Sequence, residues 1–235
     1  MSRPKTIKRT QETHARPKTA KQIEAEAHVD TLVRRGLEAL EQFRELNQEQ
    51  VDYIVAKASV AALDQHGVLA KHAHEETRRG VFEDKATKNL FACEHVVNNM
   101  RHTKTVGVIS EDEVSGLTLI AEPVGVICGI TPTTNPTSTA IFKSLIALKT
   151  RNPIVFAFHP SAQESSAHAA QVVYDAAVAA DTGMDVLTHA IEAYVSTLAN
   201  DYTDGLALQA IRLVFAHLES SVKNVDFESR EKMHN

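Results

Sequence analysis

AEPVGVICGITPTTNPTSTAIFKSLIALKTRNPIVFAFHP, residues 121–160, is the stretch that decides the fold. Its apolar, β-branched residues 124–130 predict a short strand buried on both faces of a sheet. The Pro- and Thr-rich residues 131–136 end that strand, and Thr134 offers a side-chain oxygen close to the start of the next element.

A helix and a second strand complete this unit. Pro136 suits a first helical turn, apolar residues recur at helical spacing after it, and Asn152-Pro153 ends the helix. Residues 154–158 then predict another buried strand. We expect a parallel pair of strands joined by a right-handed crossover. Proteins of the α/β class bind their ligands at the carboxyl ends of such strands.

These residues also carry a resemblance to a known family. Residues 121–160 resemble the cofactor-domain core of the CoA-acylating aldehyde dehydrogenases, above all the aldehyde half of the bifunctional aldehyde–alcohol dehydrogenases. The similarity extends from about Ile23 to Ala180 and includes EDKATKNLFACEHV, residues 83–96. It implies a Rossmann-like NAD-binding domain that feeds a catalytic domain with a nucleophilic cysteine.

Helices are expected before this core. The apolar spacing predicts four of them, in residues 19–43, 47–66, 69–79 and 82–100. Gly67 and Gly80 are expected to end the second and third helices. Short strands at residues 106–109 and 117–121 follow. We therefore expect an α/β fold in which a helical N-terminal lead enters a partial, Rossmann-like parallel sheet of four strands.

The character of the sequence changes after Ala180. An Ala-rich helix is expected over residues 161–180, and Asp181-Thr-Gly-Met184 predicts a break. Two further helices are expected, at Asp185–Tyr194 and Tyr202–Leu218. Residues 182–214 resemble the iron-dependent alcohol dehydrogenases, specifically the alcohol half of the same bifunctional enzymes. This resemblance implies a short all-helical piece of the iron-dependent alcohol dehydrogenase fold.

Three segments are therefore expected along the chain. Residues 1–21 form a basic disordered tail, residues 22–180 the N-terminal part of an aldehyde dehydrogenase domain, and residues 181–235 a fragment of the iron-dependent alcohol dehydrogenase helical domain. In the resembled enzymes several hundred residues separate the two pieces. The junction at Ala180–Asp181 thus predicts an internally deleted and truncated fragment.

Composition and charge limit the partners. The chain is 43% hydrophobic and 23% charged, with no apolar run that approaches the roughly 20 residues of a membrane helix. Residues 1–21 hold seven basic residues and one acid, a pattern that favours a solvated tail and leaves a nucleic-acid arm or transit peptide as alternatives. An aromatic content of 5% without Trp argues against nucleic-acid recognition. Two cysteines are too few for a disulfide framework and favour a reducing, cytoplasmic location.

Asp185 and His189 are the candidate metal ligands. They are four residues apart, so a helix places both on one face, where a carboxylate and an imidazole form half of a site for Fe²⁺ or Zn²⁺. On spacing alone, such a pair is more often a surface salt bridge or hydrogen bond. In the iron-dependent family the matching Asp and His bind iron together with two later histidines, whose positions His217 and His234 do not match.

Asn135 is the candidate catalytic residue. It follows the first strand, and in the resembled aldehyde dehydrogenases the matching Asn donates to the thiohemiacetal oxyanion. Without the resemblance, an Asn that caps local backbone is the simpler reading. The resemblance places Thr131, Pro132 and Thr133 on the nicotinamide side of the NAD cleft. His159 stands where many family members have a lysine that contacts the adenosine ribose.

The sequence lacks two features that the dehydrogenase reaction needs. The reaction needs a thiolate, yet Cys93 lies in a helical pattern and Cys128 in a strand, so both are expected in the core. No G-x-G-x-x-G loop is present to hold a pyrophosphate. His72 and His74, with Glu75 and Glu76 beside them, form a cluster that suggests a metal site, but residues two apart on a helix point in different directions, so the two histidines cannot share an ion. We expect them to be solvated.

The resemblance implies an NAD-dependent oxidoreductase that converts acetyl-CoA to acetaldehyde and acetaldehyde to ethanol, with Fe²⁺ in the second step. The substrates would be acetyl-CoA, acetaldehyde and ethanol, and neither nucleic acid nor membrane is an expected partner. We expect this chain to be catalytically incompetent for lack of the nucleophilic cysteine and two metal-ligand histidines. The alternatives are a non-catalytic interaction remnant, which forms a homo-oligomer, and a decayed open reading frame whose product folds poorly.

Overall fold

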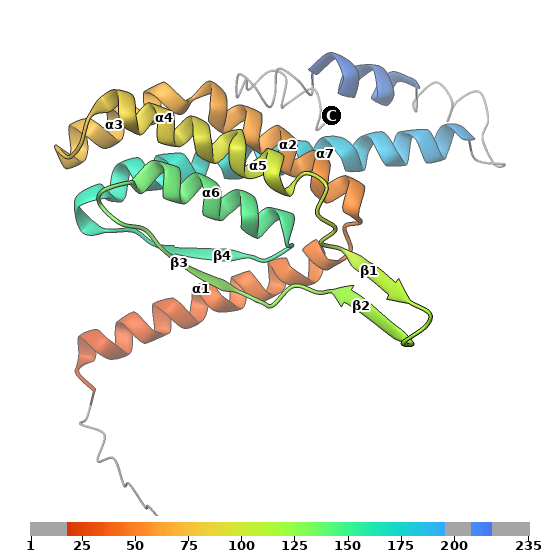
Figure 1. The fold of residues 1–235 in the computed structure, drawn as a ribbon, viewed down its shortest axis with the longest axis horizontal. Helices are drawn as coiled ribbons and strands as arrows, with labels where there is room; N and C mark the ends of the chain where they lie inside the picture. Colours follow the sequence, from red (N-terminus) through yellow and green to blue (C-terminus); the bar gives the residue numbers. More distant parts are fainter. Residues whose placement is uncertain (1–17, 196–207, 218–235) are drawn as a thin grey trace, which may run out of the picture.

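Helices make up most of the chain, and strands are few and short (Figure 1). The structure is a computed structural model that describes residues 18–195 and 208–217, with only the backbone described over 182–195. The main helices are α1 (Ala20–Arg44), α2 (Gln48–Asp64), α3 (His66–Thr77), α4 (Phe82–Cys93), α5 (His95–Met100), α6 (Pro136–Lys149) and α7 (Gln163–Val195), with a 3-10 turn, η1, at Pro160–Ala162. Residues 208–217 are also helical, inside the range predicted for the last helix.

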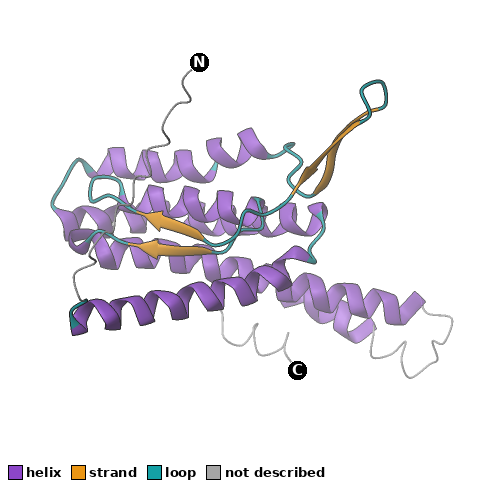
Figure 2. Ribbon diagram, turned by 90° about the horizontal axis from the view of Figure 1, so that it is seen from below, coloured by secondary structure: helices purple, strands orange, loops and turns teal. Residues whose placement is uncertain are grey.

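The described strands form two separate sheets. β1 (Gly107–Asp112) and β2 (Leu117–Ala121) pair antiparallel as a hairpin that projects away from the helices (Figure 2). β3 (Ile127–Ile130) and β4 (Ile154–Ala157) pair parallel, as predicted, with α6 as the crossover between them. The expectation of one four-stranded sheet is therefore wrong, because the hairpin pairs only with itself.

The first two helices begin as the sequence indicates. Thr19 caps α1 and Asn47 caps α2, and in both a Gln three residues later returns a hydrogen bond to the cap backbone. Such capping boxes satisfy backbone N–H groups that have no partner inside the helix. The chain therefore enters each helix at a defined residue.

Three predicted helix ends are wrong. Gly67 lies inside α3 and does not end α2; α2 stops at Asp64, and α3 starts two residues later. α3 ends through Arg78, which takes the left-handed conformation at φ 53° before Gly80. The helix predicted over residues 82–100 is divided at Glu94 into α4 and α5.

The break predicted at residues 181–184 is also absent. α7 is one helix of 33 residues that passes through Asp181 and Gly183 without interruption. A single helical Gly costs only about 1 kcal/mol relative to Ala, and the segment has no Pro. The Ala-rich residues that precede it have high helix propensity, so the helix continues.

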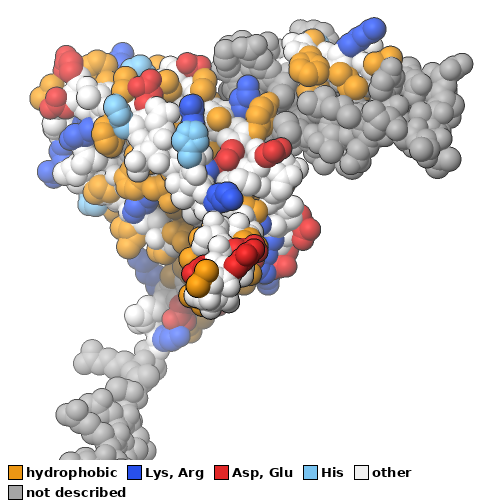
Figure 3. Space-filling model, turned by 45° about the vertical axis from the view of Figure 1, so that its right-hand side comes forward, with side chains coloured by type: hydrophobic (Ala, Val, Ile, Leu, Met, Phe, Trp, Pro, Cys, Tyr) orange, Lys and Arg blue, Asp and Glu red, His pale blue; other side chains and the backbone are white. Residues whose placement is uncertain are grey.

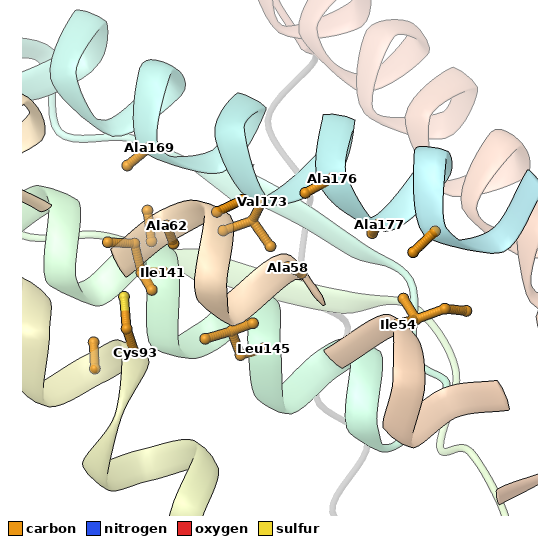
Figure 4. Close-up of a cluster of buried hydrophobic side chains, with 14 of the residues drawn as sticks. Ile54, Ala58, Ala62, Cys93, Ile141, Leu145, Ala169, Val173, Ala176 and Ala177 are labelled. Carbon is orange, nitrogen blue, oxygen red and sulfur yellow. The ribbon is translucent and has the colours of Figure 1, made fainter. Parts of the chain in front are cut away.

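The core lies where α6 meets α2, α4 and α7 (Figure 4). Ile141 and Leu145 of α6 are fully buried, and small residues of α2 and α7 let these helices approach closely. The residues labelled in Figure 4 come from all four helices: Ile54, Ala58, Ala62, Cys93, Ile141, Leu145, Ala169, Val173, Ala176 and Ala177. Burial of this apolar surface is the main stabilising term of the fold.

Polar contacts fix the end of α6. The buried Lys149 ammonium pairs with Asp52 of α2, and its backbone carbonyl accepts a hydrogen bond from Thr105 Oγ1 at 2.5 Å. Arg151 takes a left-handed conformation at φ 54° and donates to the Arg44 carbonyl at 2.6 Å. These contacts join the end of α6 to α1 and α2. Because β4 starts at Ile154, only three residues after Arg151, they also fix the position of the start of β4.

The expectation that both strands are buried on two faces is wrong. Cys128 and Ile130, alternate residues of β3, are exposed, and so is Val124 before the strand. Alternate side chains of a strand point to the same face of the sheet, so one face of β3 is open to solvent. Cys128 is thus not the core residue that its apolar surroundings in the sequence predict.

None of the helices within the described ranges combines the length and the apolar character needed to span a membrane.

Replacement of Ile141 by Ala should destabilise the chain by about 3 kcal/mol, because it leaves a cavity in the fully buried core. Ile146→Ala is the matched control, since Ile146 lies on the same helix with 42% of its surface exposed. Urea unfolding followed by circular dichroism measures both. Equal losses of stability would contradict this account of the core.

Replacement of Gly129 by Ala should also destabilise, by about 1–3 kcal/mol. A Cβ there would lie 2.8 Å from Ile154 Cδ1 and 2.9 Å from Phe156 Cδ1, too close without a shift of β4. The control is Gly67→Ala in α3, where a Cβ meets no atom within 4 Å. That variant should gain roughly 0.5–1 kcal/mol from helix propensity, and thermal melts distinguish the two results.

Candidate functional site

The loop at the carboxyl end of β3 holds most of the predicted site residues. The Thr131 backbone N–H donates to the carbonyl of Ala157 at 3.1 Å, which ties this loop to the end of β4. Thr131 is buried, and both its hydroxyl and that of Thr133 lack a hydrogen-bond partner within the described residues. Pro132 between them is exposed. Buried polar groups are normally paired, so two unpaired hydroxyls in one loop are unusual.

Asn135 is the N-cap residue of α6, directly before the helix begins at Pro136. Its carbonyl accepts from Thr139 N at 3.2 Å, but its side chain makes no cap. Its Oδ1 instead accepts a hydrogen bond from Lys88 Nζ at 3.0 Å. The cap oxygen predicted for Thr134 is wrong, because Asn135 occupies the cap position and the Thr134 carbonyl accepts from Lys85 Nζ at 3.0 Å.

His159 lies after β4 and is exposed. Its Nδ1 accepts a hydrogen bond from the Ser161 backbone N–H at 3.1 Å, which caps η1. When Nδ1 accepts, a neutral imidazole carries its proton on Nε2. Because β3 and β4 run parallel as neighbours, their carboxyl ends meet at one edge of the sheet, and His159 shares this edge with Thr131.

Lys85 and Lys88 contact the predicted site, and the sequence analysis did not identify them. Both lie on α4 and reach the loop of residues 131–135. Lys85 is only 4% exposed, and burial, followed by the charge of Lys88, lowers the pKa of its ammonium. The signal in the sequence is the three-residue spacing in EDKATKN, which places both lysines on one side of a helix.

The two candidate metal ligands lie in α7. Asp185 and His189 belong to its continuous helical backbone, four residues apart. Their side chains lie outside the described part of the structure. Among the described residues, no group of three or more His, Cys, Asp or Glu side chains could hold a metal ion.

The histidines of α3 are less solvated than the sequence predicts. His72 Nδ1 lies 3.3 Å from Nδ1 of His168 on α7, and both rings are partly buried. Burial, followed by the charge of His72, lowers the pKa of His168. Glu76 accepts hydrogen bonds from the backbone N–H groups of Glu164 and Ser165, both at 2.9 Å. This cluster fastens α3 to the amino end of α7.

The structure has two sizeable cavities among its described residues. One, of about 590 Å³, lies beside β4 between α1 and α7 and is lined mainly by apolar residues that include Phe43, Phe156, Phe158 and Tyr174. The other, of about 620 Å³, is lined by α5 and the end of α6. Among the predicted site residues, those with described side chains (Thr131, Pro132, Thr133, Asn135 and His159) line neither cavity.

Comparison with known families gives two matches along the chain. The aldehyde dehydrogenase family matches residues 2–201, and the C-terminal part of the Fe-containing alcohol dehydrogenase family matches residues 179–235. The overlap, residues 179–201, includes the junction expected at Ala180–Asp181.

Individual relatives are similar over about two thirds of the chain. The aldehyde-alcohol dehydrogenase of Streptococcus pneumoniae serotype 4 is 83% identical over 160 residues, which are 68% of this chain and 18% of that protein. The bifunctional aldehyde-alcohol dehydrogenase AdhE of Escherichia coli is 50% identical over 161 residues, again 68% of this chain and 18% of the relative. The chain therefore spans less than a fifth of the length of these relatives.

Solved structures agree with the sequence matches. An acetylating aldehyde dehydrogenase from Geobacillus thermoglucosidasius is 44% identical, with a TM-score of 0.65 over 67% of this chain and 35% of that one. A probable aldehyde dehydrogenase from Listeria monocytogenes is 37% identical, with a TM-score of 0.66 over 69% of this chain and 36% of that one. The chain thus belongs to the aldehyde dehydrogenase family and is similar in sequence to the bifunctional aldehyde–alcohol dehydrogenases, with an iron-containing alcohol dehydrogenase match from residue 179 onward.

Proposed function

We propose that this chain carries the nicotinamide and oxyanion side of a CoA-acylating aldehyde dehydrogenase cleft and does not complete the reaction by itself. The observation that carries the proposal is the position of Asn135, whose amide stands at the carboxyl end of β3 at the start of a crossover helix. An amide held there can stabilise the negative charge that develops on a substrate carbonyl oxygen. In the family this chemistry serves small-molecule aldehydes and acyl-CoA; here we propose acetaldehyde and acetyl-CoA.

The neighbouring residues fit an NAD cofactor, which supplies hydride transfer when it is bound. Thr131 and Thr133 present unpaired hydroxyls, and Pro132 presents an apolar ring between them. We propose that these three residues line the nicotinamide side. His159 would donate its Nε2–H to the adenosine ribose, where many family members use a lysine.

The cysteines support the lack of turnover. Cys93 projects into the core (Figure 4), where burial, and then the charge of Glu94, raises the pKa of its thiol to about 12. Cys128 is exposed but lies on β3 itself, two residues before the strand ends. The nucleophile of this chemistry must be a thiolate that reaches the carbonyl carbon. We propose that neither cysteine fulfils this role.

The segment from residue 181 belongs, in this proposal, to the iron-dependent alcohol dehydrogenase fold, after a basic tail (1–21) and an aldehyde dehydrogenase part (22–180). Asp185 and His189 would be two of the Fe²⁺ ligands, and the family chemistry there is the interconversion of acetaldehyde and ethanol. Stable zinc or iron centres normally use three or four protein ligands. We therefore propose weak metal binding that depends on His189.

A second candidate function is a non-catalytic interaction module, as a homo-oligomer. The β1–β2 hairpin exposes a set of large apolar side chains: Val108, Ile109, Val114, Leu117, Leu119 and Ile120. Figure 3, in which the right-hand side of Figure 1 comes forward, shows apolar and acidic side chains close together on this face. Exposed apolar surface of this kind favours association with another protein surface.

The purified chain should form no NADH in a CoA-dependent manner from acetaldehyde and NAD⁺, because no reactive thiolate faces the strand ends. NADH absorbance measures this, with a full-length acylating aldehyde dehydrogenase as the positive control. A rate that disappears in Cys93→Ser or Cys128→Ser would overturn the proposal. A defined oligomer without turnover, seen by sedimentation velocity in the same preparation, would favour the interaction module.

The two cysteines should differ in reactivity. At pH 8 a thiol with a pKa of about 12 has only about one thiolate in ten thousand molecules, and Cys93 is also inaccessible. Iodoacetamide should therefore label Cys128 in the folded chain and Cys93 only after unfolding in urea. Peptide mass spectrometry reads out both sites, and Cys128→Ser provides the control. Labelling of Cys93 in the folded chain at the rate of a free thiol would contradict its buried position.

A further inference from the structure

α4 holds the loop of residues 131–135 with two lysine side chains. Lys85 Nζ donates to the Thr134 carbonyl and Lys88 Nζ to Asn135 Oδ1, each at 3.0 Å. The lysines are three residues apart, so they project from one side of the helix. One anchors the loop backbone, and the other contacts the candidate catalytic side chain itself.

Hydrogen bonds of the neighbouring Asn89 hold this part of α4 against α3 and α6. Asn89, the next residue of α4, is fully buried. Its Nδ2 donates to the His66 carbonyl at 2.9 Å, and its Oδ1 accepts from Thr137 Oγ1 at 2.9 Å. Thr137 lies in the first turn of α6, just after Asn135. The helix that carries Lys88 and the helix that starts at Asn135 are therefore joined by a buried hydrogen bond.

The chemistry of the contact determines which way the Asn135 amide faces. A lysine ammonium has three donors and no acceptor, so only the amide oxygen can face Lys88. The Nδ2 group must then point away from Lys88, and it has no acceptor among the described residues. An Asn amide without such a partner has a broad, roughly two-fold torsion, so that oxygen and nitrogen exchange places at little cost.

We propose that Lys88 is a positioning residue for Asn135: it holds the amide oxygen and thereby presents Nδ2–H as the donor for the substrate oxyanion. This inference rests on the oxyanion role proposed above for Asn135. The positive charge also polarises the amide, which strengthens the hydrogen bond that Nδ2–H donates. Lys85 supports the same loop through its backbone and does not determine the orientation of the amide.

The test measures the order of the Asn135 side chain directly. The full chain, labelled with ¹⁵N-asparagine, gives a side-chain NH₂ signal that is assigned by its loss in Asn135→Ser. Its order parameter should lie near the value of a rigid N–H group, about 0.85, in the unmodified chain, and should fall below about 0.6 in Lys88→Met. Lys88→Arg should restore the order, because a guanidinium also donates.

Lys71→Met is the matched control, since it removes an exposed lysine from α3 and should leave the Asn135 signal unchanged. Circular dichroism verifies that each variant folds, and Lys88→Leu, which also lacks a donor, replaces Lys88→Met if that variant does not. An Asn135 order parameter that stays the same without the Lys88 ammonium would overturn the proposal. Loss of order in Lys88→Met, but no NADH binding by fluorescence in any variant, would support the positioning role and reject the NAD-binding part of the proposed function.

Discussion

The burial of α6 is the interaction on which the rest of the structure depends. Ile141 and Leu145 fill the space between α2, α4 and α7, and α6 is at the same time the crossover that connects β3 to β4. Once these side chains are buried, the start of the helix cannot move independently of the strands. The loop that carries Asn135 therefore takes its position from the hydrophobic core.

Hydrogen bonds extend this constraint to both strands. Asn152, just after α6, accepts from the Gly125 backbone N–H at 3.1 Å, and its own N–H donates to the Ala147 carbonyl at 2.9 Å. The Pro153 carbonyl accepts from Ile127 N at 2.7 Å, which joins the starts of β3 and β4. A short sheet of two strands has few ladder bonds, so contacts at its starting edge contribute much of its order.

The sequence predicted local structure well and long-range pairing less well. Short apolar runs located β3 and β4, apolar residues at helical spacing located α6, and short strands were predicted near β1 and at β2, because these signals depend on neighbours in the chain. The number of strands in each sheet and the exposure of Cys128 depend on what packs alongside, which no local pattern encodes. Asp181-Thr-Gly-Met184 predicted a break from local propensity, but the flanking helix continues through it.

The candidate site shows the same difference between local structure, which the sequence predicted, and long-range contacts, which it did not. Thr131 and His159 could be assigned to one sheet edge because the parallel crossover unit defines that edge. Lys88 could not be assigned, since its contact with Asn135 joins residues 47 positions apart.

The uninterrupted course of α7 has a mechanical consequence. A helix of 33 residues is about 50 Å long and keeps a fixed rotation of about 100° per residue. Residues on both sides of position 180 therefore share one helical phase, and one inserted or deleted residue would turn everything beyond it by that angle. The match to a second enzyme family starts within this helix, at residue 179. Two pieces of different ancestry can thus share one helix only if the apolar residues of both pieces lie on the same side of it. This requirement concerns the number of residues between the two pieces and does not depend on how similar their sequences are.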